Sequence, residues 1–442
     1  MNLKSLIVIF FLCSIFCNAQ DGFEFNSNKN KITIPFKFIN NLIFIPINVN
    51  GLELNFLLDT GVEETVLFGL EDSEQNSFAN TEKIQLKGFG NNDYVDGLKS
   101  TNNLLICKDF IDKSHELYII LEQNFNFSAQ VGIRVNGIIG YKFFKNYLIE
   151  TNYSNHKIII HKENLKIRKK INTKYSTSDI LVEKNKPYLL TKINLNQQEI
   201  ETKMLIDSGS GDALWLFENQ LKNNIKVPNQ NFEDFLGRGF SGEIYGKRAR
   251  TNKLTINKFD FEKPLTSFPD SLSITYSRLV KDREGSIGGE ILKRFDVIYD
   301  YSNQKIHFKK NGNFSMPFNF NMSGIEIEHD GLQWIAESSE FKTQQSTKIS
   351  FSDTTPKIND VKYSFSLKPL FKIANLRKNS PAEICGLRKG DLILEINNNK
   401  VFNYTLQEIN ELLKSEEGKT INIKINRDNI VYDFKFQLKS LL

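Results

Sequence analysis

Two short segments of the sequence each place an aspartate directly after an apolar run and directly before a hydroxyl residue and a glycine. Residues 56–61 are Phe-Leu-Leu-Asp-Thr-Gly, and residues 204–209 are Met-Leu-Ile-Asp-Ser-Gly. An apolar strand would hold each carboxylate rigidly at its end, and the glycine would permit the tight turn that follows. Two carboxylates in contact share one proton, and such a pair can activate water for attack on an amide without a metal or a covalent intermediate. The chemistry indicated is general acid–base hydrolysis by Asp59 and Asp207.

The two aspartates belong to an internal repeat. Asp59 and Asp207 lie 148 residues apart, and the same offset separates Gly140 from Gly288. It also separates two Tyr-Ser-Asn triplets, which begin at residues 153 and 301 and are each followed, after one residue, by Lys-Ile. A constant offset over such a span indicates a duplicated unit of about 145 residues, the size of one ordinary domain or lobe. Two copies related by a pseudo-dyad can bring two carboxylates face to face.

Each repeat is predicted to consist mostly of short strands. In the first, residues 43–49 and 52–58 are apolar runs separated by Asn50-Gly51, a dipeptide typical of a two-residue hairpin turn. The corresponding runs of the second repeat are 188–195 and 200–206. Further strands are expected at 83–87, 103–107, 157–161 and 252–256, and short helices at 141–147 and 290–295. Few helices and many short strands predict a mostly β fold with two homologous β-barrel-like lobes.

Residues 31–310 resemble an aspartic peptidase of the retropepsin or pepsin clan with both lobes fused in one chain. The segment 57–67, Leu-Leu-Asp-Thr-Gly-Val-Glu-Glu-Thr-Val-Leu, is similar to the retropepsin active-site segment, and Ile138-Ile139-Gly140 is similar to the apolar-apolar-Gly motif of that family. The resemblance implies that Asp59 and Asp207 are the catalytic pair and that no cofactor or metal is needed. It implies a supporting role in the active loops for six residues: Thr60, Gly61, Ser208, Gly209, Gly140 and Gly288.

Two glycine-rich hairpins, residues 88–97 and 237–246, would correspond to the substrate-covering flaps of the family. The resemblance implies flap or substrate contacts for six residues: Gly88, Phe89, Gly90, Gly237, Gly239 and Phe240. The second repeat departs from the family pattern at Ser286, which stands at an apolar position. Its active loop also differs, because Gly211 and Asp212 follow closely on the Asp-Ser-Gly triplet.

Three other interpretations of these segments remain open. Asp59 and Asp207 could serve only as turn formers through hydrogen bonds to nearby backbone. The lobes could keep the fold without activity, as a peptide-binding or scaffold protein that works through a C-terminal domain. A serine protease is a weaker alternative, since Ser210 and Ser241 lack a Gly-x-Ser-x-Gly elbow and an evident partner base.

The C-terminal part of the sequence resembles a different module, a bacterial PDZ domain with an α+β fold. The match is specific over residues 370–438, where Ser380-Pro381-Ala382 would begin a short helix and Gly390-Asp391 would turn into a strand. Residues 405–413 are predicted to form an amphipathic helix with Thr405 as its N-cap. A hairpin is expected to follow, with strands at 421–426 and 431–437.

The resemblance implies a peptide-binding groove in this module. Residues 322–325, Met-Ser-Gly-Ile, are similar to the carboxylate-binding loop, and a peptide would add as a strand between residues 324–328 and the helix at 405–413. The groove would be formed by Ser323, Gly324, Ile325, Ile327 and Ile409. The alternative is that the groove is occupied internally or docks against the protease lobes. The polar stretch 336–366 is predicted to be a flexible insertion.

The N-terminus has the pattern of a secretory signal peptide. Residues 1–19 contain Lys4, an apolar run and small residues before a cleavage point at Gln20. The alternative is an uncleaved membrane anchor, for which the apolar run is short. Two of the four cysteines would leave with this segment, so no disulfide framework is expected.

Composition narrows the classes of partner. A formal charge of +5 over 442 residues argues against nucleic acid, and the basic run 166–170 is interpreted as a solvated linker face. The five histidines and the remaining cysteines show no metal-ligand spacing. The expected partners are peptide or protein substrates and a C-terminal peptide ligand of the PDZ domain.

The sequence thus predicts an exported aspartic endopeptidase whose PDZ domain recruits substrate or a partner. The expected location is the periplasm, the cell surface or the medium. The predicted parts are a signal peptide at 1–19, lobe 1 at 20–165, lobe 2 at 166–312 and the PDZ domain at 321–442.

Overall fold

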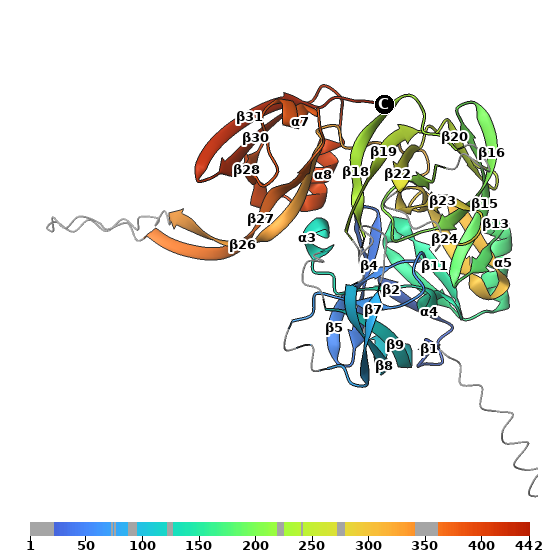
Figure 1. The fold of residues 1–442 in the computed structure, drawn as a ribbon. Coiled ribbons are helices and arrows are strands. Elements are labelled where there is room, and N and C mark those ends of the chain that lie inside the picture. The colour runs from blue at the N-terminus through green and yellow to red at the C-terminus, as the bar shows by residue number, and fades with distance from the viewer. Residues whose placement is uncertain are drawn as a thin grey trace, which may run out of the picture. The chain divides into compact units, whose positions relative to one another are not determined.

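The computed structural model describes residues 22–71, 74, 77–86, 95–121, 127–218, 225–239, 242–271, 279–340 and 361–442. The chain divides into two compact units. The first comprises residues up to 128, 133–320 and 441–442, and the second comprises 129–132 and 321–440. Both are built mostly from strands, as the sequence predicts (Figure 1). The predicted signal peptide, 1–19, lies outside the described residues.

The first unit contains one large sheet for each sequence repeat. The sheet of the first repeat has the order β1-β9-β6-β10-β5-β4-β8-β7, with β3 paired to β4. Its strands are β1 (Glu24–Phe25), β3 (Lys37–Ile39), β4 (Leu42–Val49), β5 (Leu52–Leu58), β6 (Val66–Leu67), β7 (Thr81–Leu86), β8 (Val95–Cys107), β9 (Phe110–Ile120) and β10 (Gly137–Ile139).

The sheet of the second repeat repeats this topology. Its order is β18-β19-β22-β17-β23-β16-β15-β20-β21, with β14 paired to β15. Its strands are β14 (Leu181–Glu183), β15 (Lys186–Leu195), β16 (Gln198–Ile206), β17 (Leu214–Leu216), β18 (Asn231–Gly239), β19 (Gly242–Arg250), β20 (Lys253–Ile256), β21 (Phe259–Glu262), β22 (Leu265–Pro269) and β23 (Arg283–Ile287).

A third sheet joins the two repeats and fixes their symmetry. Its order is β13-β25-β24-β11-β12-β2. Its strands are β2 (Lys31–Pro35), β11 (Leu148–Asn152), β12 (Lys157–His161), β13 (Ser176–Asp179), β24 (Phe295–Asp300) and β25 (Lys305–Lys310). In the antiparallel pairing of β11 with β24, Glu150 lies opposite Ile298, and these two positions are 148 residues apart. Equivalent positions can pair with each other only on the axis that relates the repeats, so the pseudo-dyad passes between β11 and β24.

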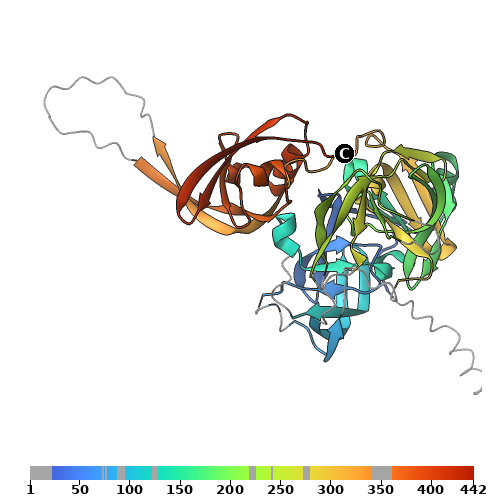
Figure 2. The same cartoon turned by 45° about the horizontal axis from the view of Figure 1, so that its top comes forward.

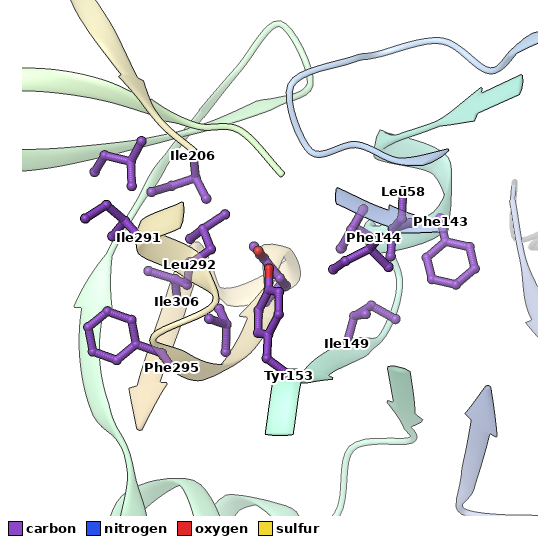
Figure 3. Packing of buried hydrophobic residues seen from close by; sticks show 14 of the residues in the cluster. Leu58, Phe143, Phe144, Ile149, Tyr153, Ile206, Ile291, Leu292, Phe295 and Ile306 are labelled. Atoms are coloured by element: carbon purple, nitrogen blue, oxygen red, sulfur yellow. The ribbon is translucent and has the colours of Figure 1, made fainter. Parts of the chain in front are cut away.

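The hairpins that lead to the two aspartates form as predicted. The turn between β4 and β5 has Asn50 and Gly51 in left-handed backbone (φ 51° and 95°), the conformation that a two-residue turn requires. The equivalent turn uses Asn196 and Gln197 (φ 51° and 66°). Leu58 and Ile206, each directly before an aspartate, are buried in one hydrophobic core that spans both repeats (Figure 3).

Short helices lie where the repeat predicts them, and one further helix corrects the prediction for residues 166–170. The first unit contains α4 (Tyr141–Phe144), α5 (Leu165–Lys174) and α6 (Gly289–Leu292), with single 3-10 turns at Tyr153–Asn155 and Tyr301–Asn303. The basic run, interpreted as a solvated linker, is part of α5. Ile167 and Ile171 are one helical turn apart and both pack into a buried cluster, while Lys170 binds Glu150 at 2.6 Å.

The described residues of the second unit form one sheet with short helical elements. The sheet order is β26-β27-β28-β30-β31, with β29 paired to β28. Its strands are β26 (Ile325–Glu340), β27 (Val361–Leu376), β28 (Leu392–Ile396), β29 (Asn399–Lys400), β30 (Thr420–Arg427) and β31 (Ile430–Gln437). The helical elements are α7 (Pro381–Ile384), the 3-10 turn Val401–Asn403 and α8 (Leu406–Leu413), and α3 (Phe127–Val131) lies where the two units divide the chain.

The helix predictions for the second unit are confirmed. Ser380 caps α7 through the N–H of Glu383, and Thr405 and Glu408 form a reciprocal capping box at the start of α8. The prediction of a flexible insertion at 336–366 is wrong at both ends. β26 and β27 continue to Glu340 and from Val361 as a long two-stranded ribbon (Figure 2), and 341–360 lie outside the described residues. Among the helices that the structure describes, none has the length and apolar character to cross a membrane.

Candidate active site

The first active loop follows β5 and is packed against β10. The N–H of Asp59 donates to the carbonyl of Ile139 (2.9 Å), and β10 runs parallel to β5. Gly140 has to be a glycine, because a Cβ there would overlap the carbonyl of Val62 and lie 2.8 Å from the carbonyl of Asp59. The Ile138-Ile139-Gly140 segment therefore lies directly against the loop that carries Asp59.

The second active loop repeats this arrangement with the substitutions noted in the sequence. Asp207 N–H donates to Ile287 (2.9 Å), and a Cβ on Gly288 would lie 2.8 Å from the carbonyl of Ser210. Ser286, at the expected apolar position, is buried, and its hydroxyl accepts a hydrogen bond from Arg283 Nη2 (2.7 Å). The serine is thus satisfied by a partner that the first repeat does not have.

The hydroxyl residues of the two loops bind each other across the pseudo-dyad. Thr60 N–H donates to Ser208 Oγ and Ser208 N–H donates to Thr60 Oγ1, both at 3.0 Å. Thr60 Oγ1 then donates to the carbonyl of Ile206 (2.6 Å), and Ser208 Oγ donates to that of Leu58 (2.8 Å). Both hydroxyl residues are buried, so these four bonds hold the loops in one fixed relation.

These four hydrogen bonds form a clasp between the two loops. The clasp brings the two carboxyl groups together. Asp59 Oδ1 accepts from Gly61 N–H (2.6 Å), Asp207 Oδ1 accepts from Gly209 N–H (3.2 Å), and the two carboxyls lie close enough for each to act on the pKa of the other. Each carboxyl lies over the glycine of the other loop. A Cβ on Gly61 would be 2.8 Å from Asp207 Oδ1, and a Cβ on Gly209 would overlap the carboxyl of Asp59.

The electrostatic surroundings of the pair are asymmetric. Burial, with the charge of Asp207 adding to it, raises the pKa of Asp59 to about 8. Burial also raises the pKa of Asp207, but Arg283 and Lys186 act against that rise. Burial of both carboxyls favours one shared proton on the pair, and the cations that act on Asp207 favour Asp59 as its place.

The two cations come from positions that are apolar in the first repeat. Lys186 directly follows the two-residue turn into β15, where Leu42 follows the turn into β4. Arg283 stands 148 residues after Val135, which is buried. Sequence reasoning missed both cations. The signal available was the comparison of the repeats position by position, because a cation replaces an apolar residue at each site.

Turns from each repeat brace the active loop of the other. Asn41 Nδ2, in the β3–β4 turn, donates to the carbonyl of Gly211 (2.8 Å) and to Glu290 Oε2 (2.9 Å). A Cβ on Gly211 would lie 2.5 Å from the carbonyl of Asn40, which explains the additional glycine of the second loop. In the opposite direction, Asn185 Nδ2 donates to Glu63 Oε1 (2.7 Å).

The charge that follows the second loop is paired with an arginine. Asp212 Oδ1 binds Arg248 Nη1 (2.9 Å), and its other oxygen accepts from Trp215 Nε1 (2.7 Å). Arg248, on β19, also binds Asp234 on β18 (2.8 Å). Because β18 and β19 form the hairpin of the predicted second flap, this network ties the base of that hairpin to the active loop.

The predicted flap residues are only partly described. Gly237 and Gly239 lie on β18, and Gly237 (φ 143°) sits at a bulge opposite β19, with open space where a Cβ would be. Gly88, Phe89, Gly90 and Phe240 lie outside the described residues.

An acid–histidine–hydroxyl chain beside the first loop does not offer a serine-protease site. Asp112 Oδ2 lies 2.6 Å from His115 Nδ1, and His115 Nε2 lies 2.7 Å from Thr65 Oγ1. All three side chains are buried, with His115 0% exposed, so no substrate reaches the hydroxyl. Within the residues that the structure describes, no cluster of His, Cys, Asp or Glu could hold a metal ion.

The predicted groove residues of the second unit lie on β26, the loop before it, and α8. Ser323, Ile325 and Ile409 are 0% exposed, and Ile327 is 6% exposed. Gly324 has left-handed backbone (φ 83°), and a Cβ there would overlap Ser380. The structure brings these residues together at the outer edge of the sheet, where β26 is paired only with β27 among the described strands.

Comparison with known proteins identifies part of the chain. A family model described as the PDZ domain matches residues 372–427. The probable 26S proteasome non-ATPase regulatory subunit 9 of Caenorhabditis elegans is 37% identical over 65 residues, which is 14% of this chain and 33% of that protein. The chain thus spans about a third of the length of this curated relative. Among solved structures, the aspartic proteinase from Irpex lacteus covers 65% of this chain and 100% of its own, with a TM-score of 0.42 and 10% identity. The C-terminal region is therefore a PDZ domain.

Proposed function

We propose that the chain is an exported aspartic endopeptidase, and that its PDZ domain recruits or positions a substrate or partner. The observation that carries this proposal is the pair of active loops, clasped through Thr60 and Ser208, with their two buried carboxyls brought close together. A pair of turn formers would need neither the clasp nor the contact between carboxyls. The proposed lobes are residues 20–165 and 166–312, preceded by a signal peptide at 1–19 and followed by the PDZ domain at 321–442.

The proposed reaction assigns a different role to each aspartate. Asp207, whose pKa is lowered by Arg283 as well as by Lys186, takes a proton from water as the water oxygen bonds to the peptide carbonyl carbon. Asp59 gives its proton to the carbonyl oxygen, which forms a tetrahedral diol. The C–N bond then breaks, the amine receives the proton held by Asp207, and Asp59 recovers one from a diol hydroxyl. The reaction ends with an acid, an amine and the dyad in its starting state.

The test of this function is cleavage of a peptide library by the mature protein between pH 3 and 8. We expect cuts within peptide chains, identified by mass spectrometry of the new termini. If every peptide stays intact at each pH while circular dichroism shows a folded protein, the peptidase proposal fails. The rival hypothesis, an inactive peptide-binding protein that works through the PDZ domain, then becomes the leading one.

Lys186 provides a test of the electrostatic assignment. Replacing it with leucine, the residue of the first repeat, is expected to move the pH profile of kcat/KM to higher pH. The ammonium lowers the pKa of both aspartates, so without it each proton leaves at a higher pH. Besides the dyad, Arg283 and Glu63 act on the pKa of Lys186, and neither changes in the variant.

The measurement is kcat/KM for one fluorogenic peptide from pH 3 to 10, and the wild type should lose activity above about pH 8 as Asp59 loses its proton. Lys192→Leu is the matched control, since Lys192 lies on the same strand, is 53% exposed and pairs with Glu199. A pH profile of Lys186→Leu that stays in place or moves to lower pH would contradict the assignment.

A further inference from the structure

In the loop before β26, backbone N–H groups donate hydrogen bonds to side chains of the same loop. The side-chain oxygen of Asn321 accepts from the backbone N–H of Ser323 (3.0 Å) and of Gly324 (3.1 Å). Ser323 Oγ accepts from the N–H of Ile325 (3.0 Å). These are the N–H groups that the 322–325 segment would offer to a terminal carboxylate, and all three have a side-chain acceptor already.

Asn321 also donates a hydrogen bond to the carbonyl of Ile325, the first residue of β26. Carbonyl groups alternate in direction along a strand, and Gly324 O accepts from Arg377 N–H (2.8 Å) at the end of β27. Ile325 O therefore points to the opposite edge of β26, where Asn321 Nδ2 donates to it (2.7 Å). The Asn321 amide thus presents an oxygen to the loop and an N–H to the strand. The last residue of an added peptide strand would present the same two groups.

The surroundings of the loop are closed in the same way. Met322 N–H donates to the carbonyl of Leu413 (3.1 Å), which ties the loop to the end of α8. Ile325 and Ile409 are both 0% exposed. A terminal side chain would find both of these apolar groups already buried.

We propose that Asn321 takes the place of the C-terminal residue of a ligand, and that this PDZ domain binds internal extended segments along β26 instead of free C-termini. A carboxylate that binds at the loop would only replace the side-chain acceptors that these N–H groups already have. It would therefore gain little binding free energy. An internal segment has no carboxylate to place, and it can add to β26 beyond Ile325 through main-chain hydrogen bonds. This inference rests on the recruiting role proposed above and is independent of the peptidase activity.

The test compares two libraries of random seven-residue peptides displayed on phage, one at a free C-terminus and one flanked by chain on both sides. The bait is the full chain with Asp59→Asn, which prevents cleavage of displayed peptides under the proposed mechanism. We expect enrichment from the internal library only. Synthetic copies of the enriched sequences should bind equally well with a free or an amidated C-terminus in fluorescence anisotropy.

Two variants of Asn321 test the mechanism. Asn321→Ala frees the N–H groups of Ser323 and Gly324, and it should enrich the C-terminal library and favour a free carboxylate over its amide by about tenfold or more. Asn321→Asp keeps an acceptor for both N–H groups and adds a like charge, so it should still reject free C-termini. Thermal unfolding of both variants shows whether the domain stays folded.

The outcomes are decisive without any variant. Enrichment of carboxylate-dependent peptides by the unmodified loop would overturn the inference, as would the absence of enrichment from both libraries. Neither result bears on cleavage, which is measured separately with the wild type. If the protein binds internal segments but cuts no peptide, the binding inference holds and the proposed peptidase activity is refuted.

Discussion

Asp59→Asn and Asp207→Asn are each expected to lower kcat/KM for peptide cleavage by about a thousandfold or more. Asparagine has the shape of aspartate but can neither take a proton from water nor pass one to the carbonyl oxygen. Because the two carboxyls act as one proton-sharing unit, the double variant should be little worse than either single variant. That non-additivity is specific to a dyad, and two independent groups would show additive losses.

The same variants should keep their fold. Burial raises the pKa of both aspartates, so neutral side chains at these positions remove a cost that the folded state carries at neutral pH. Thermal unfolding midpoints should therefore equal or exceed that of the wild type at pH 7. Asp179→Asn is the surface control, since its side chain is 87% exposed. A single variant that keeps more than about a tenth of the activity would argue against a shared-proton mechanism.

The repeat in the sequence carried most of the information about the site. The 148-residue offset predicted both loops and the glycines beside them, and β11 and β24 pair through residues at that same offset. Local patterns were enough there, because an apolar strand followed by Asp-Thr/Ser-Gly has its own geometry. The hairpin turn at Asn50-Gly51 is equally local.

What the sequence could not predict depends on the other lobe. Gly211 looked like a departure from the pattern, and its reason is the carbonyl of Asn40, which comes from a turn about 170 residues earlier. Lys186 lies 21 residues before Asp207, and only the folded sheet brings it to the dyad. Helix α5 was missed because its apolar face has two residues, Ile167 and Ile171, within a strongly basic run.

Gly209→Ala is expected to abolish activity almost as completely as loss of an aspartate. A Cβ at this position would overlap the Cγ and Oδ2 of Asp59, and that carboxyl cannot move away freely because Gly61 N–H holds its Oδ1 at 2.6 Å. Either the two loops separate or the Asp59 carboxyl turns away from Asp207. A displacement of about 1 Å at reacting groups costs roughly a hundredfold in rate, so we expect a loss of at least that size.

The equivalent change in the first loop should be milder, although the two glycines are related by the pseudo-dyad. A Cβ on Gly61 would meet Asp207 Oδ1 at 2.8 Å, a close contact that a small side-chain rotation relieves. The comparison is made with kcat/KM for each variant, corrected for the folded fraction, and with Gly312→Ala as a control that has open space around it. Equal losses for Gly61→Ala and Gly209→Ala would mean that the carboxyls sit symmetrically. A larger loss at Gly209 would mean that the Asp59 carboxyl lies deeper over the opposite loop than the Asp207 carboxyl does. Burial at that place raises the pKa of Asp59, so Asp59 keeps the proton that the proposed mechanism gives to the substrate.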